Sequence, residues 1–253
     1  MVVKAKALAA DIEQHLTKAR SRDGYRPVNF SAPTWEKWLR DIERVSVDFR
    51  AFKGAVTRGE MVALVDTSLK RGREGVADAF VIAMLWGHGK SGYGAYRTHE
   101  VLTQGTAPLS GDVLDRLHAS VEPIRRGPES AFWFMNNLNT REGGVGGKVR
   151  SLGPAFFTKW MYAVSAKGDP SSSEALPILD AVMRSAVAPM WDRRGGPRMG
   201  RTADYVEYTN ALKQWGRPFD ASAVDVEEAI FDVSQGYTNL ERLAPRPLER
   251  VFG

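Results

Sequence analysis

Apolar residues recur every three to four positions along most of the chain, which is the spacing of amphipathic helices. Glycines interrupt this pattern at residues 86–97 and 139–153. No stretch of useful length alternates between apolar and polar residues as a half-buried strand does. The pattern therefore predicts an all-α protein. Its predicted helices span residues 4–20, 35–52, 59–71, 74–86, 111–124, 128–138, 152–164, 181–190, 202–215 and 224–234.

Local signals place some of the helix ends and the overall organisation. Thr34 stands directly before the second predicted helix, where a hydroxyl side chain caps the first turn. A chain of 253 residues is long enough for one large domain or for two small, closely joined helical lobes. We expect residues 1–253 to form a single helical domain, with an N-terminal helical part at 1–75 and a core at 76–253.

Two charged residues stand alone in apolar surroundings. Lys159 is the one lysine in the run LGPAFFTKWMYAV, which covers residues 152–164, and Asp180 is the one acid in ALPILDAVM, residues 175–183. A helix that is apolar on all sides is normally buried, and buried lysine and aspartate are normally paired. The 21 residues between them allow a helix to end and the chain to turn back. We therefore predict a Lys–Asp pair in a cleft between helices.

Such a pair has a catalytic and a structural interpretation. Burial lowers the pKa of a lysine amine and makes a nucleophile available near neutral pH. Alternatively, Lys159 extends its stem over apolar surface and keeps its ammonium in water. Asp180 equally fits the N-cap of the helix AVMRSAVAPM that follows it. The cap and a catalytic role are compatible.

Composition excludes several kinds of chemistry. The chain has no cysteine, which excludes disulfides, thiol nucleophiles and cysteine-bound zinc or iron–sulfur clusters. The four histidines are scattered, so we expect no metal and no other cofactor. No apolar run approaches the length of a membrane span and the N-terminus lacks the features of a signal peptide. We expect a cytoplasmic protein with no membrane contact.

The charge favours a polyanionic partner. The net charge is +5 and the isoelectric point is about 9.4, and the basic residues cluster on both sides of the apolar Lys159 segment. One cluster precedes that segment and another lies in the glycine-rich stretch DRRGGPRMGR, although each alone is equally typical of a solvated loop. The predicted phosphate-binding side chains are Lys148, Arg150, Arg193, Arg194 and Arg198.

The segments SLGPAFFTKWMYAV and LPILDAVM resemble the signature of the helix-hairpin-helix DNA glycosylase superfamily. The resemblance is closest to the bacterial proteins with an 8-oxoguanine-glycosylase-like fold, and the phrases WGHGKSGYGAYRT and VDVEEAIFDVSQG extend it over about residues 80–235. In that superfamily a hairpin, here at about 145–165, binds DNA phosphate through backbone N–H groups. Its Gly-x-Gly is replaced here by Ala155 and Phe157.

The resemblance implies a fold and an activity. It implies a helix-hairpin-helix glycosylase fold that excises an oxidised purine such as 8-oxoguanine from DNA, with Lys159 as the nucleophile and Asp180 assisting. It also implies that Gly153 and Thr158 contact DNA, that the enzyme has AP lyase activity through a Schiff base, and that it is associated with the nucleoid. A flipped base needs a pocket with aromatic walls. The proposed pocket residues, each of which equally fits the core, are Trp86, Phe156, Phe157 and Trp160.

Two other function classes remain at this point. One is a catalytically silent module of the same fold that only binds DNA. The other is a Schiff-base lyase that acts on a small carbonyl compound. Such a substrate does not require basic loops, so the all-α fold with its basic loops favours DNA. The expected partner is double-stranded DNA with a damaged base, bound by a monomer.

Overall fold

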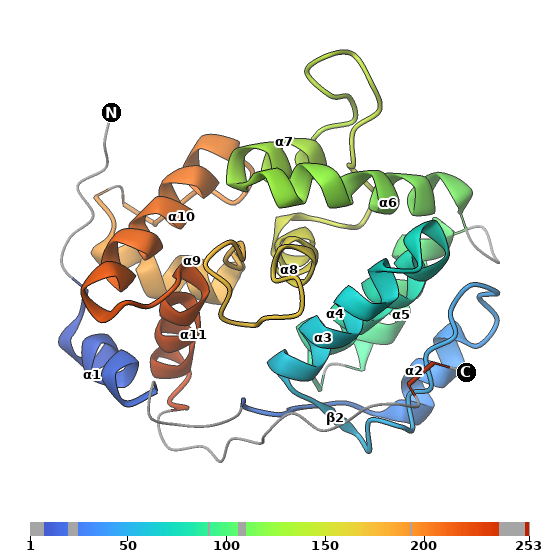
Figure 1. Cartoon of the computed structure of the whole chain (residues 1–253), viewed down its shortest axis with the longest axis horizontal. Coiled ribbons are helices and arrows are strands. Elements are labelled where there is room, and N and C mark those ends of the chain that lie inside the picture. Colours follow the sequence, from blue (N-terminus) through green and yellow to red (C-terminus); the bar gives the residue numbers. More distant parts are fainter. Residues whose placement is uncertain are drawn as a thin grey trace.

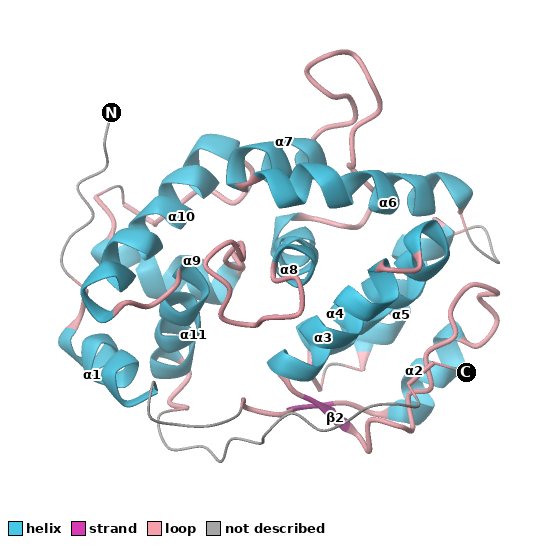
Figure 2. Ribbon diagram, viewed as in Figure 1, coloured by secondary structure: helices cyan, strands magenta, loops and turns pink. Residues whose placement is uncertain are grey.

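The computed structural model describes residues 8–19, 25–90, 92–105, 110–192, 194–237 and 251–252. Helices dominate these parts of the chain, together with one two-stranded antiparallel sheet, so the all-α prediction is confirmed (Figure 2). The helices are α1 (Ala10–Ala19), α2 (Ala32–Leu39), α3 (Arg58–Leu69), α4 (Val76–His88), α5 (Tyr93–Thr103), α6 (Gly111–Arg126), α7 (Pro128–Asn136), α8 (Pro154–Ser165), α9 (Ala181–Val187), α10 (Thr202–Gly216) and α11 (Ala223–Ser234).

Helix α8 lies at the centre of the molecule and the other helices surround it (Figure 1). On one side it packs against α3 and α4, and α6 and α7 cross one end of this arrangement. On the other side α9, α10 and α11 form a second group, with α1 packed against α11. The sheet of β1 (Val28–Asn29) and β2 (Ala55–Val56) lies beneath the start of α3, which follows β2 in the chain.

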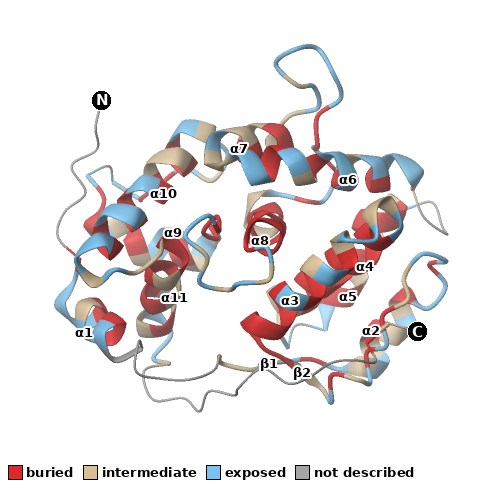
Figure 3. Cartoon of the chain, in the orientation of Figure 1, coloured by how far each residue is buried: buried red, intermediate tan, exposed pale blue. Residues whose placement is uncertain are grey.

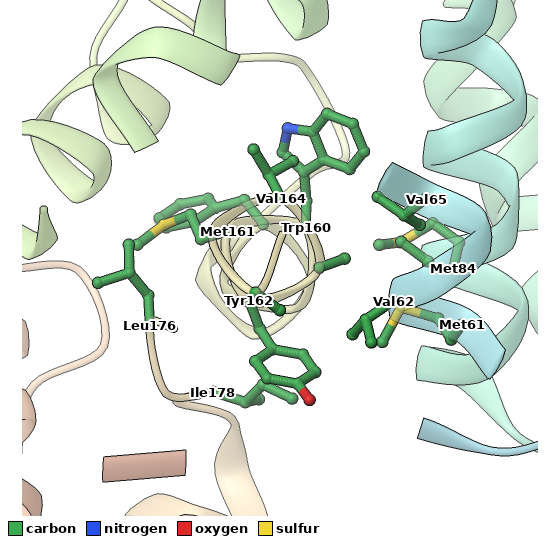
Figure 4. Close-up of a cluster of buried hydrophobic side chains, with 14 of the residues drawn as sticks. Met61, Val62, Val65, Met84, Trp160, Met161, Tyr162, Val164, Leu176 and Ile178 are labelled. Atoms are coloured by element: carbon green, nitrogen blue, oxygen red, sulfur yellow. The ribbon is translucent and has the colours of Figure 1, made fainter. Parts of the chain in front are cut away.

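Burial follows this arrangement. Ten consecutive residues of α4, from Val76 to Leu85, are buried, and so are nine of α8, from Phe157 to Ser165 (Figure 3). Figure 4 looks nearly along α8, with Met61 and Val62 of α3 on one side and Leu176 on the other. Most side chains on every side of both helices are apolar, as is typical of enclosed helices, and the charged residues among the buried ones are Asp78 of α4 and Lys159 of α8.

Several sequence predictions about where helices begin and end differ from the structure. Helix α2 ends at Leu39, well short of residue 52, and its N-cap is Ser31 rather than Thr34. The first helix begins at Ala10, so residues 8 and 9 are not helical as predicted, while residues 4–7 and 20 of the predicted helix lie outside the described part. The interruption at the glycine-rich stretch 86–97 is shorter than expected, because α4 continues to His88 and α5, which was not predicted, starts at Tyr93.

The segment before α8 was predicted as a DNA-binding hairpin at about 145–165. Residues 137–153 form no helix, and a bridge between Asn139 and Val145 closes the arch that stands out above α7 in Figure 1. Gly153 is the N-cap of α8, and its carbonyl accepts hydrogen bonds from the N–H groups of Phe156 and Phe157. A direct loop-to-helix junction thus stands where the resemblance implies a hairpin.

Candidate functional site

Lys159 sits in the second turn of α8, with 11% of its side chain exposed. Its Nζ donates to the Ala155 carbonyl one turn earlier at 3.2 Å and lies 5.7 Å from the centre of the Phe156 ring. The stem is thus enclosed while the ammonium reaches a pocket at the end of the helix. The alternative in which Lys159 keeps its ammonium in water is therefore wrong, because the ammonium ends in this pocket and not in bulk water.

Asp180 is placed by the extended segment that precedes α9. The hydroxyls of Tyr205 and Tyr208 on α10 donate to the Pro177 and Ile178 carbonyls, each at 2.7 Å. From α8, the Thr158 hydroxyl accepts a hydrogen bond from the Leu179 N–H at 3.2 Å. Buried side chains from α8 and from α10 therefore fix the backbone that carries Asp180.

The two lone charges meet as predicted. Lys159 Nζ lies 2.8 Å from Asp180 Oδ2, and the Asp180 side chain is 18% exposed. The other carboxylate oxygen, Oδ1, accepts from the Met183 N–H at 3.0 Å, so Asp180 is also the N-cap of α9. The Asp180 carboxylate thus caps the N-terminus of α9 and also neutralises the enclosed Lys159 ammonium.

The pKa of Asp180 reflects opposing effects. Burial raises the pKa of this carboxyl, but the nearby Lys159 ammonium and the N–H groups of Met183 and Val182 outweigh burial and hold the pKa below its ordinary value. Asp180 is therefore an anion at neutral pH. It can stabilise positive charge that develops on a substrate.

The ion pair opens into a pocket of about 230 Å³ between the two helix groups. Its walls come from the segment around β1, the ends of α3, α4 and α8, and helix α11. Apolar and charged side chains share the lining, as is typical of a site that encloses and orients a small group. The lining residues are Arg26, Val28, Arg58, Trp86, Gly87, His88, Gly89, Lys159, Ile178, Asp180, Glu227, Glu228 and Phe231.

A second buried ion pair forms part of this lining. Arg58 donates to Glu227 at 2.7 Å and to Glu228 at 3.4 Å. Its guanidinium lies 4.7 Å from the ring centre of Tyr162 and 5.4 Å from that of Trp86. Burial raises the pKa of Glu227 to about 7, against the opposing effect of Arg58. The pocket therefore contains a carboxyl that exchanges its proton near neutral pH.

His88 stands beside Lys159 as a neutral group. Burial, with the positive charges of Lys159 and Arg97, lowers the pKa of His88 to about 4. Its ring stacks on Phe156, with the ring centres 4.4 Å apart and the planes 27° apart. His88 thus adds no positive charge next to the ammonium at neutral pH.

Two of the four predicted base-pocket aromatics are at the site. Trp86 lines the pocket and Phe156 packs over Lys159. Phe157 and Trp160 point into the core instead, where Phe157 packs on Phe132 and Trp160 packs on Phe80. Phe157 and Trp160 were wrongly predicted as pocket residues. They lie two positions before and one position after Lys159, and residues so close in sequence point in different directions from a helix.

Thr158 was wrongly predicted to contact DNA. It is fully buried, and its hydroxyl donates to the Pro154 carbonyl at 2.8 Å while accepting from Leu179. Its position next to Lys159 therefore supports the backbone before Asp180 rather than a phosphate.

The predicted phosphate-binding residues differ in their availability. Lys148 and Arg150 are exposed on either side of the buried Val149, and Gly153 is exposed at the start of α8. Arg194 is exposed as well. The Arg198 guanidinium instead makes two hydrogen bonds to the buried Asp204 carboxylate, at 2.9 and 2.8 Å. Arg193 lies outside the described residues.

Sequence reasoning missed the part of the pocket that contains Arg58 and the acids of α11. No comparable signal pointed to these residues. Glu227 shares the buried side of α11 with Val224, Ile230 and a second acid, Asp232, and it stands in the charged run DVEE. Arg58 opens α3, where the buried residues that follow it include the charged Glu60.

The described residues contain no group of three or more His, Asp or Glu side chains that could hold a metal ion. None of the described helices combines the length and the apolar character needed to cross a membrane.

Comparison with protein families matches residues 24–231 to the family described as "Putative 8-oxoguanine DNA glycosylase OGG-like protein". The chain belongs to this OGG-like family. The matched range includes Lys159, Asp180 and every pocket residue named above. Comparisons with curated proteins and with solved structures found no match.

Proposed function

We propose that this OGG-like protein is a DNA glycosylase that excises an oxidised purine such as 8-oxoguanine, with AP lyase activity. The observation that carries the proposal is the Lys159–Asp180 pair, 2.8 Å apart at the opening of an enclosed pocket. A carboxylate in a cleft whose pKa is shifted by a specific charged partner, as that of Asp180 is, is typical of functional sites. Membership of the family supplies the substrate class.

The chemistry assigned to this pair is displacement of the base by an amine. Lys159 first passes a proton to the Asp180 carboxylate, which lies in hydrogen-bonding distance. The neutral amine then attacks C1′ of the nucleotide as the bond from C1′ to the base breaks. The departing base takes up the proton, and the Asp180 anion stabilises positive charge on the sugar. The sugar ring then opens to a Schiff base on Lys159, and β-elimination breaks the strand.

The pocket is suited to a base that has left the duplex. Flipped bases are stacked against aromatic or apolar side chains and held by hydrogen bonds at their edges. Trp86 and Phe231 supply aromatic surface, while Glu227 and Glu228 supply acceptors for N–H groups. We assign Phe156 to the rim of the pocket, since it covers the Lys159 ammonium.

We assign the binding of DNA phosphates to the exposed side of the segment 148–153, which precedes α8. Lys148 and Arg150 are two residues apart with their neighbour Val149 buried, so both charges lie on the outer side of an extended segment. This segment ends at Gly153, where helix N–H groups and the helix dipole favour an anion. Arg194 extends the basic surface next to α9. Such contacts make binding to DNA depend on salt.

A catalytically silent DNA-binding module is the second candidate. It would explain the basic surface equally well. The enclosed Lys–Asp pair favours the enzyme, because an ion pair of this kind is costly to desolvate and a binding module gains nothing from it.

Borohydride trapping tests the proposal. The wild-type protein is mixed with a duplex that contains one 8-oxoguanine opposite cytosine, and sodium borohydride reduces any Schiff base to a stable adduct. We expect an adduct with wild type and none with Lys159→Gln. Lys167→Gln is the matched control, because Lys167 follows the same helix but pairs with Glu174 at the surface and should leave the adduct unchanged.

Each alternative has its own result. Base loss that appears only after hot alkali, without an adduct, would retain the glycosylase and remove the lyase step. Salt-sensitive DNA binding with no base loss over a panel of oxidised bases would contradict the enzyme and favour the silent module. An adduct that persists in Lys159→Gln would place the nucleophile elsewhere.

A further inference from the structure

Gly87 lies against the side chain of Lys159. It is the next-to-last residue of α4, and a Cβ atom built on it would stand 2.7 Å from Lys159 Cδ and 3.4 Å from Cε. Real Cβ atoms essentially never come within 3.0 Å of another heavy atom in this way. Any side chain at position 87 therefore occupies space that the lysine stem now fills.

The backbone at this position does not itself call for glycine. Gly87 has no left-handed φ, whereas its neighbour Gly89 has a φ of 58°. A glycine inside a helix is less favourable than alanine, because it leaves more backbone freedom to be lost on folding. Helix formation alone would thus favour alanine, and the close approach of Lys159 is the feature that glycine permits.

The lysine has little other space to occupy. Its Nζ is held between the Ala155 carbonyl and Asp180, and the Phe156 ring, stacked on His88, covers its other side. His88 in turn lies against Gly94 of α5, where a Cβ atom would come within 2.5 Å of the histidine. The stem of Lys159 is therefore confined between the end of α4 and this pair of stacked rings.

We propose that Gly87 is a positioning residue, whose missing side chain lets Lys159 extend along the end of α4 and reach Asp180. Its role in catalysis rests on the proposed function, whereas its role in forming the ion pair does not. In Gly87→Ala, the new Cβ would stand 2.7 Å from Lys159 Cδ. Rotation of the flexible lysine side chain would then increase this distance to an ordinary contact beyond 3.4 Å. The ammonium would move with it and leave the Asp180 carboxylate.

The first test follows the charge on Asp180 without any DNA. The pKa of the Asp180 carboxyl is measured by carbon NMR titration in wild type, Gly87→Ala and Gly92→Ala, with Asp180→Asn used to assign the signal. Gly92 is the matched control, because it is the N-cap of α5 with a φ of −61° and has no atom within 4 Å of an added Cβ. We expect the pKa to rise toward its ordinary value in Gly87→Ala only. An unchanged pKa in that variant overturns the proposal.

A second test decides the proposal even if the Gly87→Ala protein folds poorly. Truncation by Lys159→Ala removes the atoms that alanine at position 87 would meet. The melting temperature should therefore rise when Gly87→Ala is added to Lys159→Ala, since only the helix preference remains, and should not rise in the wild-type background. An equal change in both backgrounds means that the lysine stem is not what requires glycine, and overturns the proposal.

Trapping with 8-oxoguanine DNA then connects position to activity. In Gly87→Ala we expect the rate of adduct formation to fall at least tenfold while the dissociation constant for DNA stays within twofold, and both to be unchanged in Gly92→Ala. If wild type forms no adduct but the titration and melting results hold, the proposed function fails and the positioning role stands. If wild type reacts and Gly87→Ala reacts equally fast, the catalytic part of this proposal is wrong.

Discussion

Asp180 makes two separable contributions to stability through its two carboxylate oxygens. Oδ1 caps α9 by accepting from Met183, and Oδ2 neutralises Lys159. Asp180→Asn retains an oxygen for the cap and removes the charge, whereas Asp180→Ala removes both. Comparison of the two variants therefore separates the cap from the ion pair.

The magnitudes follow from the burial of the pair. Removing one partner of a fully buried ion pair costs about 3–5 kcal/mol, and an exposed pair contributes about 0–1 kcal/mol. Because the side chains are 11% and 18% exposed, we expect Asp180→Asn to lower the free energy of unfolding by about 2 kcal/mol. Loss of the cap in Asp180→Ala should lower it by a further ~1 kcal/mol.

Urea unfolding at pH 7, followed by circular dichroism, measures these free energies. The same substitutions are made in a Lys159→Gln background, where no ammonium needs a partner. There Asp180→Asn should cost less than about 0.5 kcal/mol, which gives a coupling energy of roughly 1.5 kcal/mol between the two residues. The ordinary pKa of aspartate is about 3.9. Because the pKa of Asp180 is lowered by folding, its contribution is present above that value and is lost as the pH falls through the lower folded pKa.

Two results would refute this account. Equal stability of Asp180→Asn and Asp180→Ala would mean that the cap contributes nothing. An equal cost of Asp180→Asn with and without Lys159 would mean that the ion pair has no net coupling, and the lone-charge argument would lose its energetic basis.

Two further predictions concern buried polar groups. Burial raises the pKa of Glu227 from an ordinary 4.5 to about 7, so the folded state prefers the protonated acid, and stability should fall as the pH rises through this interval. In Glu227→Gln the melting temperature should lose this part of its pH dependence between pH 5 and 8, and an unchanged slope would contradict the assignment. Thr158→Val leaves the Leu179 N–H without its acceptor and should cost about 1–3 kcal/mol in urea unfolding. The salt dependence of its DNA binding should stay at the wild-type value, and a shallower dependence would restore Thr158 as a phosphate contact.

Most helices were predictable because their signals are local. The segments near α3, α4, α6, α7, α8, α10 and α11 show apolar residues at helical spacing, and their predicted ends lie within a few residues of the observed ones. Helix α5 was missed because four glycines in the stretch 86–97 interrupt the helical pattern, although Gly94 lies inside the helix where it packs on His88. The sequence does not distinguish a glycine that allows close packing inside a helix from a glycine that allows a turn.

The central pair of the site was predictable for a different reason. Lys159 and Asp180 each stand out as one charge in an apolar run, and burial makes an unpaired charge too costly to retain. The same reasoning does not identify Glu227, because α11 has other acids beside it and buries Asp232 as well. Neither residue type nor spacing indicated that Arg58 would be its partner, because the two are 169 residues apart in the chain.

The sequence alone determined the helical class, the family resemblance and the need for a Lys–Asp pair, because periodicity and the cost of buried charge act within short segments. Only the tertiary structure decided which aromatic rings face the pocket. On α8, Phe156 covers Lys159 while Phe157 and Trp160 turn into the core. The direction of a side chain depends on what packs around its helix, and for α8 those neighbours come from distant parts of the chain.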